Sequence, residues 1–169
     1  MPMTINTVNK KNFELLDENK LAVARLIYTT SAFDDAVIEA GENFLLNGIA
    51  TGIWITHLGN DNSVKTRSKI RVETGGIISV ALSGKKRKYF FKRSGGWKLR
   101  FYLTNKDGED LLTLIPHVNW QKESHDYILQ LNEEYEKECD SFVILHAVHC
   151  ANCSLSMMTG GKVPALVSI

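Results

Sequence analysis

The sequence predicts a mainly β protein: a closed antiparallel β-barrel of about 12 strands around a C-terminal hydrophobic helix. Residues 141–158 carry no charged side chain. Residues 12–131 contain short apolar and β-branched runs, separated by turn signals about every 8 to 12 residues, as in sandwiches and barrels. A barrel of that many strands is too wide for side chains alone to fill, whereas a helix about 10 Å across fits inside it.

The uncharged segment is either a membrane span or a helix buried on all sides. At about 1.5 Å per residue it is about 27 Å long, slightly less than a hydrocarbon core of about 30 Å. It contains His146, His149 and Asn152, which would lack partners in lipid. The preceding residues 133–138 are mostly acidic, whereas a span favours Lys or Arg at one end. We therefore expect a buried helix and keep the membrane span as the alternative.

The strands are expected between turns rich in Gly, Asn and Asp, at residues 17–20, 59–62, 74–76, 84–86, 94–96 and 105–108. Residues 97–103 alternate apolar and polar side chains, and the Asp-Gly pair in 105–108 is the clearest hairpin signal. The expected strands are 13–16, 21–28, 36–39, 43–46, 52–57, 64–72, 77–82, 87–93, 97–103, 111–115, 118–120 and 125–131.

Length and composition favour one domain, expected at residues 12–161 with terminal extensions at 1–11 and 162–169. Twenty basic and nineteen acidic residues give a net charge of +1, so no global field favours nucleic acid and none is expected as a partner. The first eleven residues lack the apolar core of a signal peptide. Three cysteines, an odd number, fit reduced thiols in the cytoplasm.

Four segments carry a family resemblance: Tyr89–Phe91, Gly96–Phe101, Asp107–Leu112 and the helix 142–158. Together with the long β-meander that ends in a hydrophobic helix, they resemble the tubby C-terminal-like superfamily. That superfamily includes LURP-one-related proteins, which have no settled activity, and phospholipid scramblases. The resemblance implies phosphoinositide binding by basic residues on the barrel, or scramblase-like membrane association through the helix. The absence of an acidic calcium loop and of a cysteine-rich segment argues against calcium-triggered lipid scrambling.

The densest positive charge lies on two adjacent predicted strands and the turn before them. Alternation places Lys98 and Arg100 opposite the apolar residues of their strand, and Lys88 and Lys92 share one face of theirs. Such cations hold phosphate by charge-assisted hydrogen bonds; a solvated charged surface is the alternative. The candidate ligand-binding residues are Lys85, Lys86, Lys88, Lys92, Lys98 and Arg100.

The helix also carries a His-x-x-His-Cys-x-x-Cys pattern, from His146 to Cys153. Histidine and cysteine are natural zinc ligands, but four of them on one straight helix extend over about 10 Å, too far for one tetrahedral metal. Redox chemistry of a Cys-x-x-Cys pair needs an exposed thiol at a helix N-terminus, and these cysteines lie in mid-helix. We expect neutral histidines that are hydrogen-bonded to the barrel wall, and no metal, cofactor or catalytic residue.

The leading hypothesis is a non-enzymatic cytoplasmic module that binds an anionic phospholipid, a membrane surface or another phosphorylated ligand at the basic strands. One alternative is a membrane-associated protein whose C-terminal helix leaves the barrel and inserts. The least favoured alternative is a metal- or thiol-dependent enzyme using the helix residues. The sequence indicates no particular protein partner.

Overall fold

The computed structural model describes residues 3–30, 33–59, 61, 63–71, 75–82, 84–94, 99–119 and 124–158. These residues form twelve β-strands, a 3-10 helix η1 and an α-helix α1. The elements are β1 (Thr4–Asn9), β2 (Asn12–Leu16), β3 (Ala22–Tyr28), β4 (Asp35–Ala40), β5 (Glu42–Ala50), β6 (Ile53–Leu58), β7 (Thr66–Arg71), β8 (Gly75–Leu82), β9 (Lys85–Ser94), β10 (Arg100–Asn105), β11 (Asp110–Asn119), β12 (Ser124–Leu131), η1 (Glu133–Glu138) and α1 (Ser141–Met158).

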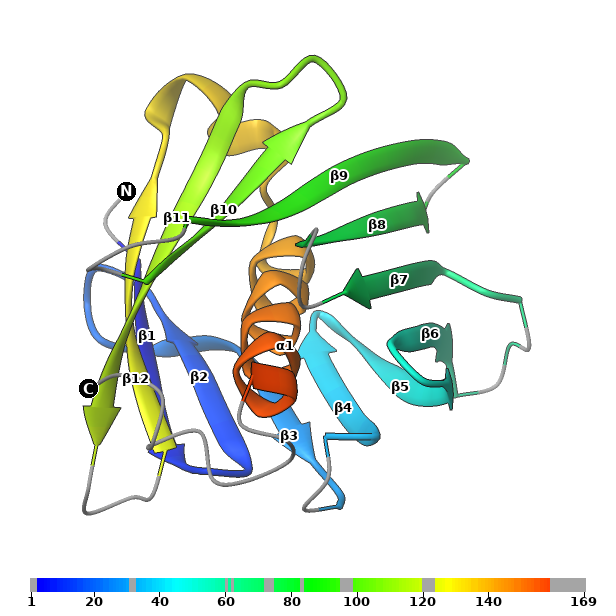
Figure 1. The fold of residues 1–169 in the computed structure, drawn as a ribbon, viewed down its shortest axis with the longest axis horizontal. Helices are drawn as coiled ribbons and strands as arrows, with labels where there is room; N and C mark the ends of the chain where they lie inside the picture. The colour runs from blue at the N-terminus through cyan, green and yellow to red at the C-terminus, as the bar shows by residue number, and fades with distance from the viewer. Residues whose placement is uncertain are drawn as a thin grey trace.

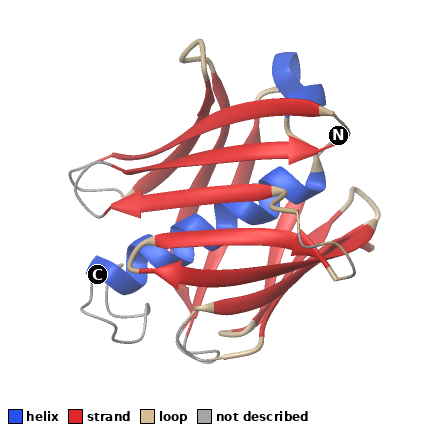
Figure 2. Ribbon diagram, turned by 90° about the vertical axis from the view of Figure 1, so that its right-hand side faces the viewer, coloured by secondary structure: helices blue, strands red, loops and turns tan. Residues whose placement is uncertain are grey.

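The strands form one antiparallel sheet in which the spatial order equals the chain order, from β1 to β12. The sheet curls into a nearly closed barrel with α1 inside it (Figure 1). The side view shows the helix running through the space that the strands enclose (Figure 2). At the seam, β1 and β12 lie side by side. The Thr7 hydroxyl donates a hydrogen bond of 2.8 Å across this seam to the His125 carbonyl oxygen.

The predicted barrel with a C-terminal helix is confirmed, and α1 has the expected bounds, Ser141–Met158. The helix begins there because Asp140 caps it: the Asp140 carboxylate accepts a bond of 2.9 Å from the Val143 backbone N–H. This helix is long and apolar enough to cross a membrane by length and composition, but 78% of it is buried inside the barrel.

Two predicted boundaries are corrected. Residues 1–11 were expected to lie outside the barrel, yet Thr4–Asn9 forms β1 and pairs with β2, placing Ile5 and Thr7 in the interior. The expected strands 111–115 and 118–120 are one strand, β11. Its Pro116 pairs with Tyr127 of β12 but lies beyond Leu114, the last β11 residue paired with β10, and a strand position that is paired on one side only tolerates proline. The extension 162–169 lies outside the described residues.

The core lies between the helix and the inner faces of the strands. Every α1 residue from Phe142 to Leu155 is buried, which explains why the segment is apolar on all sides. Wall strands alternate, as in β2, where Phe13 and Leu15 are fully buried between half-buried neighbours. Each buried Leu, Ile or Phe stabilises the fold by about 1.5–3 kcal/mol before the entropy of folding is counted.

Candidate functional site

The outer surface of β7 is uniformly basic. Successive residues of β7 alternate between buried and exposed, because side chains of a strand point to opposite faces of the sheet. Thr66, Ser68 and Ile70 face the core, and the three exposed side chains are Arg67, Lys69 and Arg71.

Strand β9 presents a second row of cations on the same side of the wall. Its Tyr89 and Phe91 are buried, with only 1% of each side chain exposed. Lys86, Lys88 and Lys92 are exposed. The aromatic rings therefore anchor β9 in the core and fix the outward direction of its lysines.

Strand β8 separates the two rows and has no charged side chain on its outer surface. Ser79 pairs with Arg67 on one side and Lys88 on the other, and Ile77 pairs with Lys69 and Phe90. We call the outward residues of these three strands the basic face. Its members are Arg67, Lys69 and Arg71 of β7, Gly75, Ile77, Ser79 and Ala81 of β8, and Lys86, Lys88, Phe90 and Lys92 of β9.

Within the part of the chain that the structure describes, the cations of the basic face form no salt bridges with carboxylates. Salt bridges between described residues occur elsewhere: Arg25 with Glu39, Lys65 with Asp61, and Arg87 with Asp140. None of the six cations of the basic face forms a salt bridge with another residue that the structure describes. On the other side of β7, β6 places Ile53 opposite Lys69 and Ile55 opposite Arg67. The six charges therefore add to a local positive potential that favours anions.

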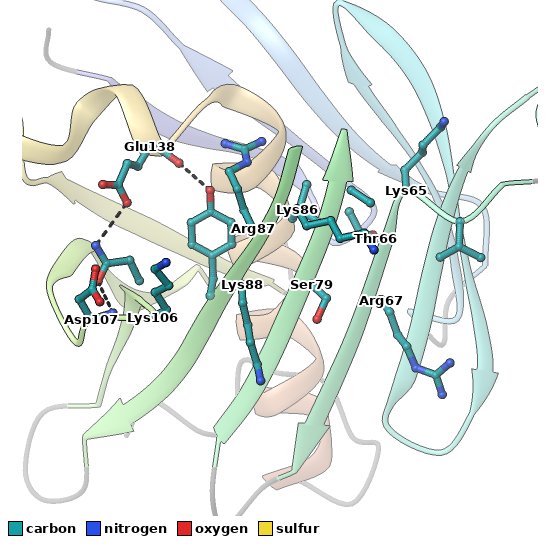
Figure 3. A pocket seen from close by; sticks show the side chains of 15 residues that line it. Lys65, Thr66, Arg67, Ser79, Lys86, Arg87, Lys88, Lys106, Asp107 and Glu138 are labelled. Atoms are coloured by element: carbon teal, nitrogen blue, oxygen red, sulfur yellow. Dashed lines mark hydrogen bonds between the residues drawn. The ribbon is translucent and has the colours of Figure 1, made fainter. Parts of the chain in front are cut away.

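A cavity of about 620 Å³ opens at one end of the basic face (Figure 3). Arg67 and Lys88 flank Ser79 there, and Lys65 and Lys86 lie at the next position along the strands. Beyond β9 the cavity reaches the β10–β11 turn and η1, with the following additional polar lining residues: Asn105, Lys106, Asp107 and Glu138. This end is therefore cationic on the β7–β9 side and mixed in charge beside the turn.

A second cavity, of about 410 Å³, lies at the other end of the basic face. Three cations line it, Lys69, Arg71 and Lys92, together with apolar side chains and Gly75–Gly76. The two glycines contribute no side chain of their own to this cavity. Gly75 has φ +83°, and a Cβ built there would collide with the Phe91 carbonyl oxygen, so only glycine fits this close approach.

The candidate residues predicted from the sequence divide between these two ends. Lys86 and Lys88 line the first cavity, beside the exposed Lys85 at the start of β9, and Lys92 lines the second. Lys88 and Lys92 share the outer face of β9, as predicted. Arg100 pairs with Ser94 and lines neither cavity, whereas Tyr102 lies opposite Lys92. Lys98 lies outside the described residues.

Sequence reasoning missed the β7 cations. Arg67, Lys69 and Arg71 are separated by uncharged residues, so they do not form a dense charge run in the sequence. The signal that would have found them is their spacing of two, which places all three on one face of a strand. The register of β7, β8 and β9 then brings them level with the lysines of β9.

The polar residues of the helix form a second cluster, in the core. The hydroxyl group of Tyr28 lies 2.8 Å from His149 Nδ1 and accepts a bond of 3.2 Å from Asn152 Nδ2. Tyr127 donates to Asn152 Oδ1 over 2.6 Å. The Cys153 sulfur lies 3.4 Å from His149 Nε2, and burial raises the pKa of this thiol well above its usual value. The thiol is therefore protonated and unreactive at neutral pH.

His146 departs from the prediction that both histidines would be hydrogen-bonded to the wall. His149 has such a partner, but neither ring nitrogen of His146 has one, and the side chain is fully buried. Burial lowers the pKa of His146 to about 4. Burial, and secondly the neighbouring His146, lower the pKa of His149. Among the described residues, no group of three or more His, Cys, Asp or Glu side chains is arranged to hold a metal.

Comparisons with protein families, with curated proteins and with solved structures find no match to this chain. The resemblance to the tubby-like superfamily therefore stays a prediction from the sequence. The geometry of the basic face has to support a functional conclusion by itself.

Proposed function

We propose that this protein is a non-enzymatic binding module that holds a phosphate-bearing anion on the basic face. The observation that carries the proposal is the pair of cation rows on β7 and β9, which have no described acidic partner. Two of the six side chains are arginines, whose planar guanidinium groups bind phosphate oxygens in pairs. The two cavities give such a ligand concave places to bind.

The buried residues support a binding role over catalysis. The candidate nucleophile Cys153 is only 2% exposed, and burial holds it as a neutral thiol. The lowered pKa values of His146 and His149 have burial as their main cause, and both rings lie in the core. Perturbed pKa values in a closed core are a property of packing, not of an accessible site.

A co-sedimentation experiment tests the proposal. Phosphatidylcholine vesicles with and without phosphatidylinositol bisphosphate serve as the lipid arm, and soluble inositol hexakisphosphate, followed by calorimetry, serves as the free-phosphate arm. We expect binding in at least one arm that weakens as salt rises from 50 to 200 mM, because exposed charges are screened. The variant Lys69→Gln/Arg71→Gln should bind at least 10-fold more weakly.

The matched control is Lys10→Gln/Lys11→Gln, which removes two exposed cations from the β1–β2 turn, away from the basic face. This control should bind as the unaltered chain does. Equal loss in both double variants would show that only net charge matters. The proposal would be refuted if neither the vesicles nor inositol hexakisphosphate bind and the oligonucleotides tested below do not bind either.

A further inference from the structure

The cations of the basic face lie in two lines parallel to β8, not in one cluster. Outward residues of a strand recur every second position, so they are spaced by about 6.8 Å. The three β7 cations follow this spacing, whereas Phe90 separates Lys88 from Lys92 on β9. From Ala81 to Gly75 the floor extends over about 20 Å, and Ser79 lies in the middle between Arg67 and Lys88. One cavity lies at each end of this floor. The shape is a track with positive sides and a neutral centre.

We infer that the ligand of the basic face is a single-stranded nucleic acid whose phosphate backbone lies along β8. This inference rests on the proposed binding of a phosphate-bearing anion. A chain with one negative charge per repeat can contact cations in both lines over the full length of the track. A single head group fills one cavity only. A membrane presents a layer of mobile head groups, which has no need of a neutral strip between two lines of cations.

The middle of the track is apolar and exposed. Ile77 is 37% exposed, and its partner on β9 is the half-buried Phe90. The Lys88 ammonium lies 5.5 Å from the centre of the Phe90 ring. Tyr102 lies opposite Lys92 on β10 and is also half-buried. Single-stranded nucleic acids bind surfaces on which a basic track follows the backbone and aromatic rings contact the bases, largely without regard to sequence.

The net charge of +1 does not conflict with this inference. Nucleic-acid binding depends on cations that contact phosphates, and their local arrangement sets the affinity. Several acidic residues lie in η1, for instance Glu133, Glu134 and Glu136, and Asp107 and Glu138 reach only the first cavity, on its β10–β11 side. Because the molecule as a whole is nearly neutral, we expect a moderate affinity for nucleic acid. Its salt dependence should be set by the cations of the track alone.

Fluorescence anisotropy with labelled oligothymidylates of 2, 4, 8 and 12 nucleotides tests the inference, with an oligouridylate and a 12-base-pair duplex beside them. A track of about 20 Å accommodates about four extended nucleotides, near the lower end of site sizes for single-strand binding folds. Affinity should therefore rise steeply from two to four nucleotides and then level off. Four nucleotides present about four phosphates to the track, so the logarithm of the affinity should fall against the logarithm of salt with a slope of about −3.

Two variants remove cations from opposite ends of the track, Arg67→Gln/Lys88→Gln and Arg71→Gln/Lys92→Gln. Each should weaken 12-nucleotide binding at least 10-fold and make the salt slope shallower by about 1.4. The control Lys10→Gln/Lys11→Gln should change neither quantity. Loss of binding in only one of the two end variants would show a single-cavity ligand and overturn the inference. Equal or tighter binding of the duplex would also overturn it.

The vesicle and inositol phosphate arms separate this inference from the proposed function. If those ligands bind through the basic face and the oligonucleotides do not, the proposed function stands and the nucleic-acid ligand is wrong. If the oligonucleotides bind and the lipid does not, the inference stands and the phosphate-bearing ligand is identified as a nucleic acid. If nothing binds, both fail.

Discussion

The same strands of this barrel carry two regions of opposite character. On its inner side, β7 presents Thr66, Ser68 and Ile70 to a core without charge, and on its outer side it presents three cations. The interior also contains a hydrogen-bonded cluster around His149 and a fully buried His146 whose ring nitrogens have no hydrogen-bond partner among the described residues. Changes inside should therefore act on the free energy of unfolding, and changes on the basic face should act on binding.

The largest effect is expected from Asn152→Leu. This variant removes the acceptor of the Tyr127 hydroxyl and one partner of Tyr28, so a phenol is left unpaired in the core. An unsatisfied buried polar group costs about 1–3 kcal/mol, and we expect a loss of about 2–3 kcal/mol in urea unfolding. Asn152→Leu should destabilise the protein less when Tyr127→Phe is also present, because the hydroxyl group without a partner is then absent. If the losses of the two single variants simply add in the double variant, the hydrogen bond between Tyr127 and Asn152 is contradicted.

Acid should produce the next effect. The pKa of His146 in the fold is about 4, mainly because of burial, below the unfolded value of about 6.5. The unfolded chain therefore binds the proton more tightly. The contribution of His146 to stability is complete above pH of about 6.5 and is lost as the pH falls towards 4. At about 1.4 kcal/mol per pH unit, the loss approaches about 3 kcal/mol. Urea unfolding at pH 7, 5.5 and 4.5 measures it.

His146→Leu sharpens the contrast between the two histidines. Neither His146 nitrogen has a partner, so an apolar side chain of similar volume should raise the free energy of unfolding at pH 7 by about 1 kcal/mol. It should also flatten the acid dependence. His149→Leu should instead destabilise, because it breaks the contact with Tyr28. A destabilised His146→Leu variant would show that His146 has a polar partner.

The smallest effect on stability should come from the basic face. Arg67→Gln/Lys88→Gln changes two exposed side chains without salt bridges among the described residues. Its free energy of unfolding should stay within about 0.5 kcal/mol of the unaltered chain. A larger loss in urea unfolding would mean that these cations stabilise the barrel, and any loss of binding would then have a second explanation.

The sequence predicted the barrel and its helix because both have strong periodic or compositional signals. The uncharged run begins after Asp140 and is closed by Thr159, Gly160 and Gly161, and α1 has the bounds expected from it. Strand β1 was missed because TINTVN has only Ile5 and Val8 as apolar residues, and β11 was divided at Pro116. Local composition does not reveal that a polar strand pairs at an edge, or that a proline lies at a position paired on one side only.

The candidate site was predicted in part for a similar reason. The run Lys85–Lys88 is dense enough to attract attention in the sequence, whereas the three β7 cations are not. Their proximity to β9 depends on the register of three strands, and their lack of ion pairs with other described residues depends on the arrangement of the surrounding surface. The missing partner of His146 depends on how α1 is rotated inside the wall, which a nearly uniform apolar helix does not encode in its sequence.

The position of α1 at the end of the chain has a consequence for synthesis. Each strand pairs with its neighbour in the sequence, so hairpins can form as the chain leaves the ribosome. The helix, however, contacts residues more than a hundred positions earlier, such as Tyr28 with His149. The wall has no complete core until α1 emerges, and such long-range contacts make folding slow. The nascent barrel therefore exposes its apolar inner surface throughout most of translation, and such exposed surface favours aggregation until the helix fills the barrel.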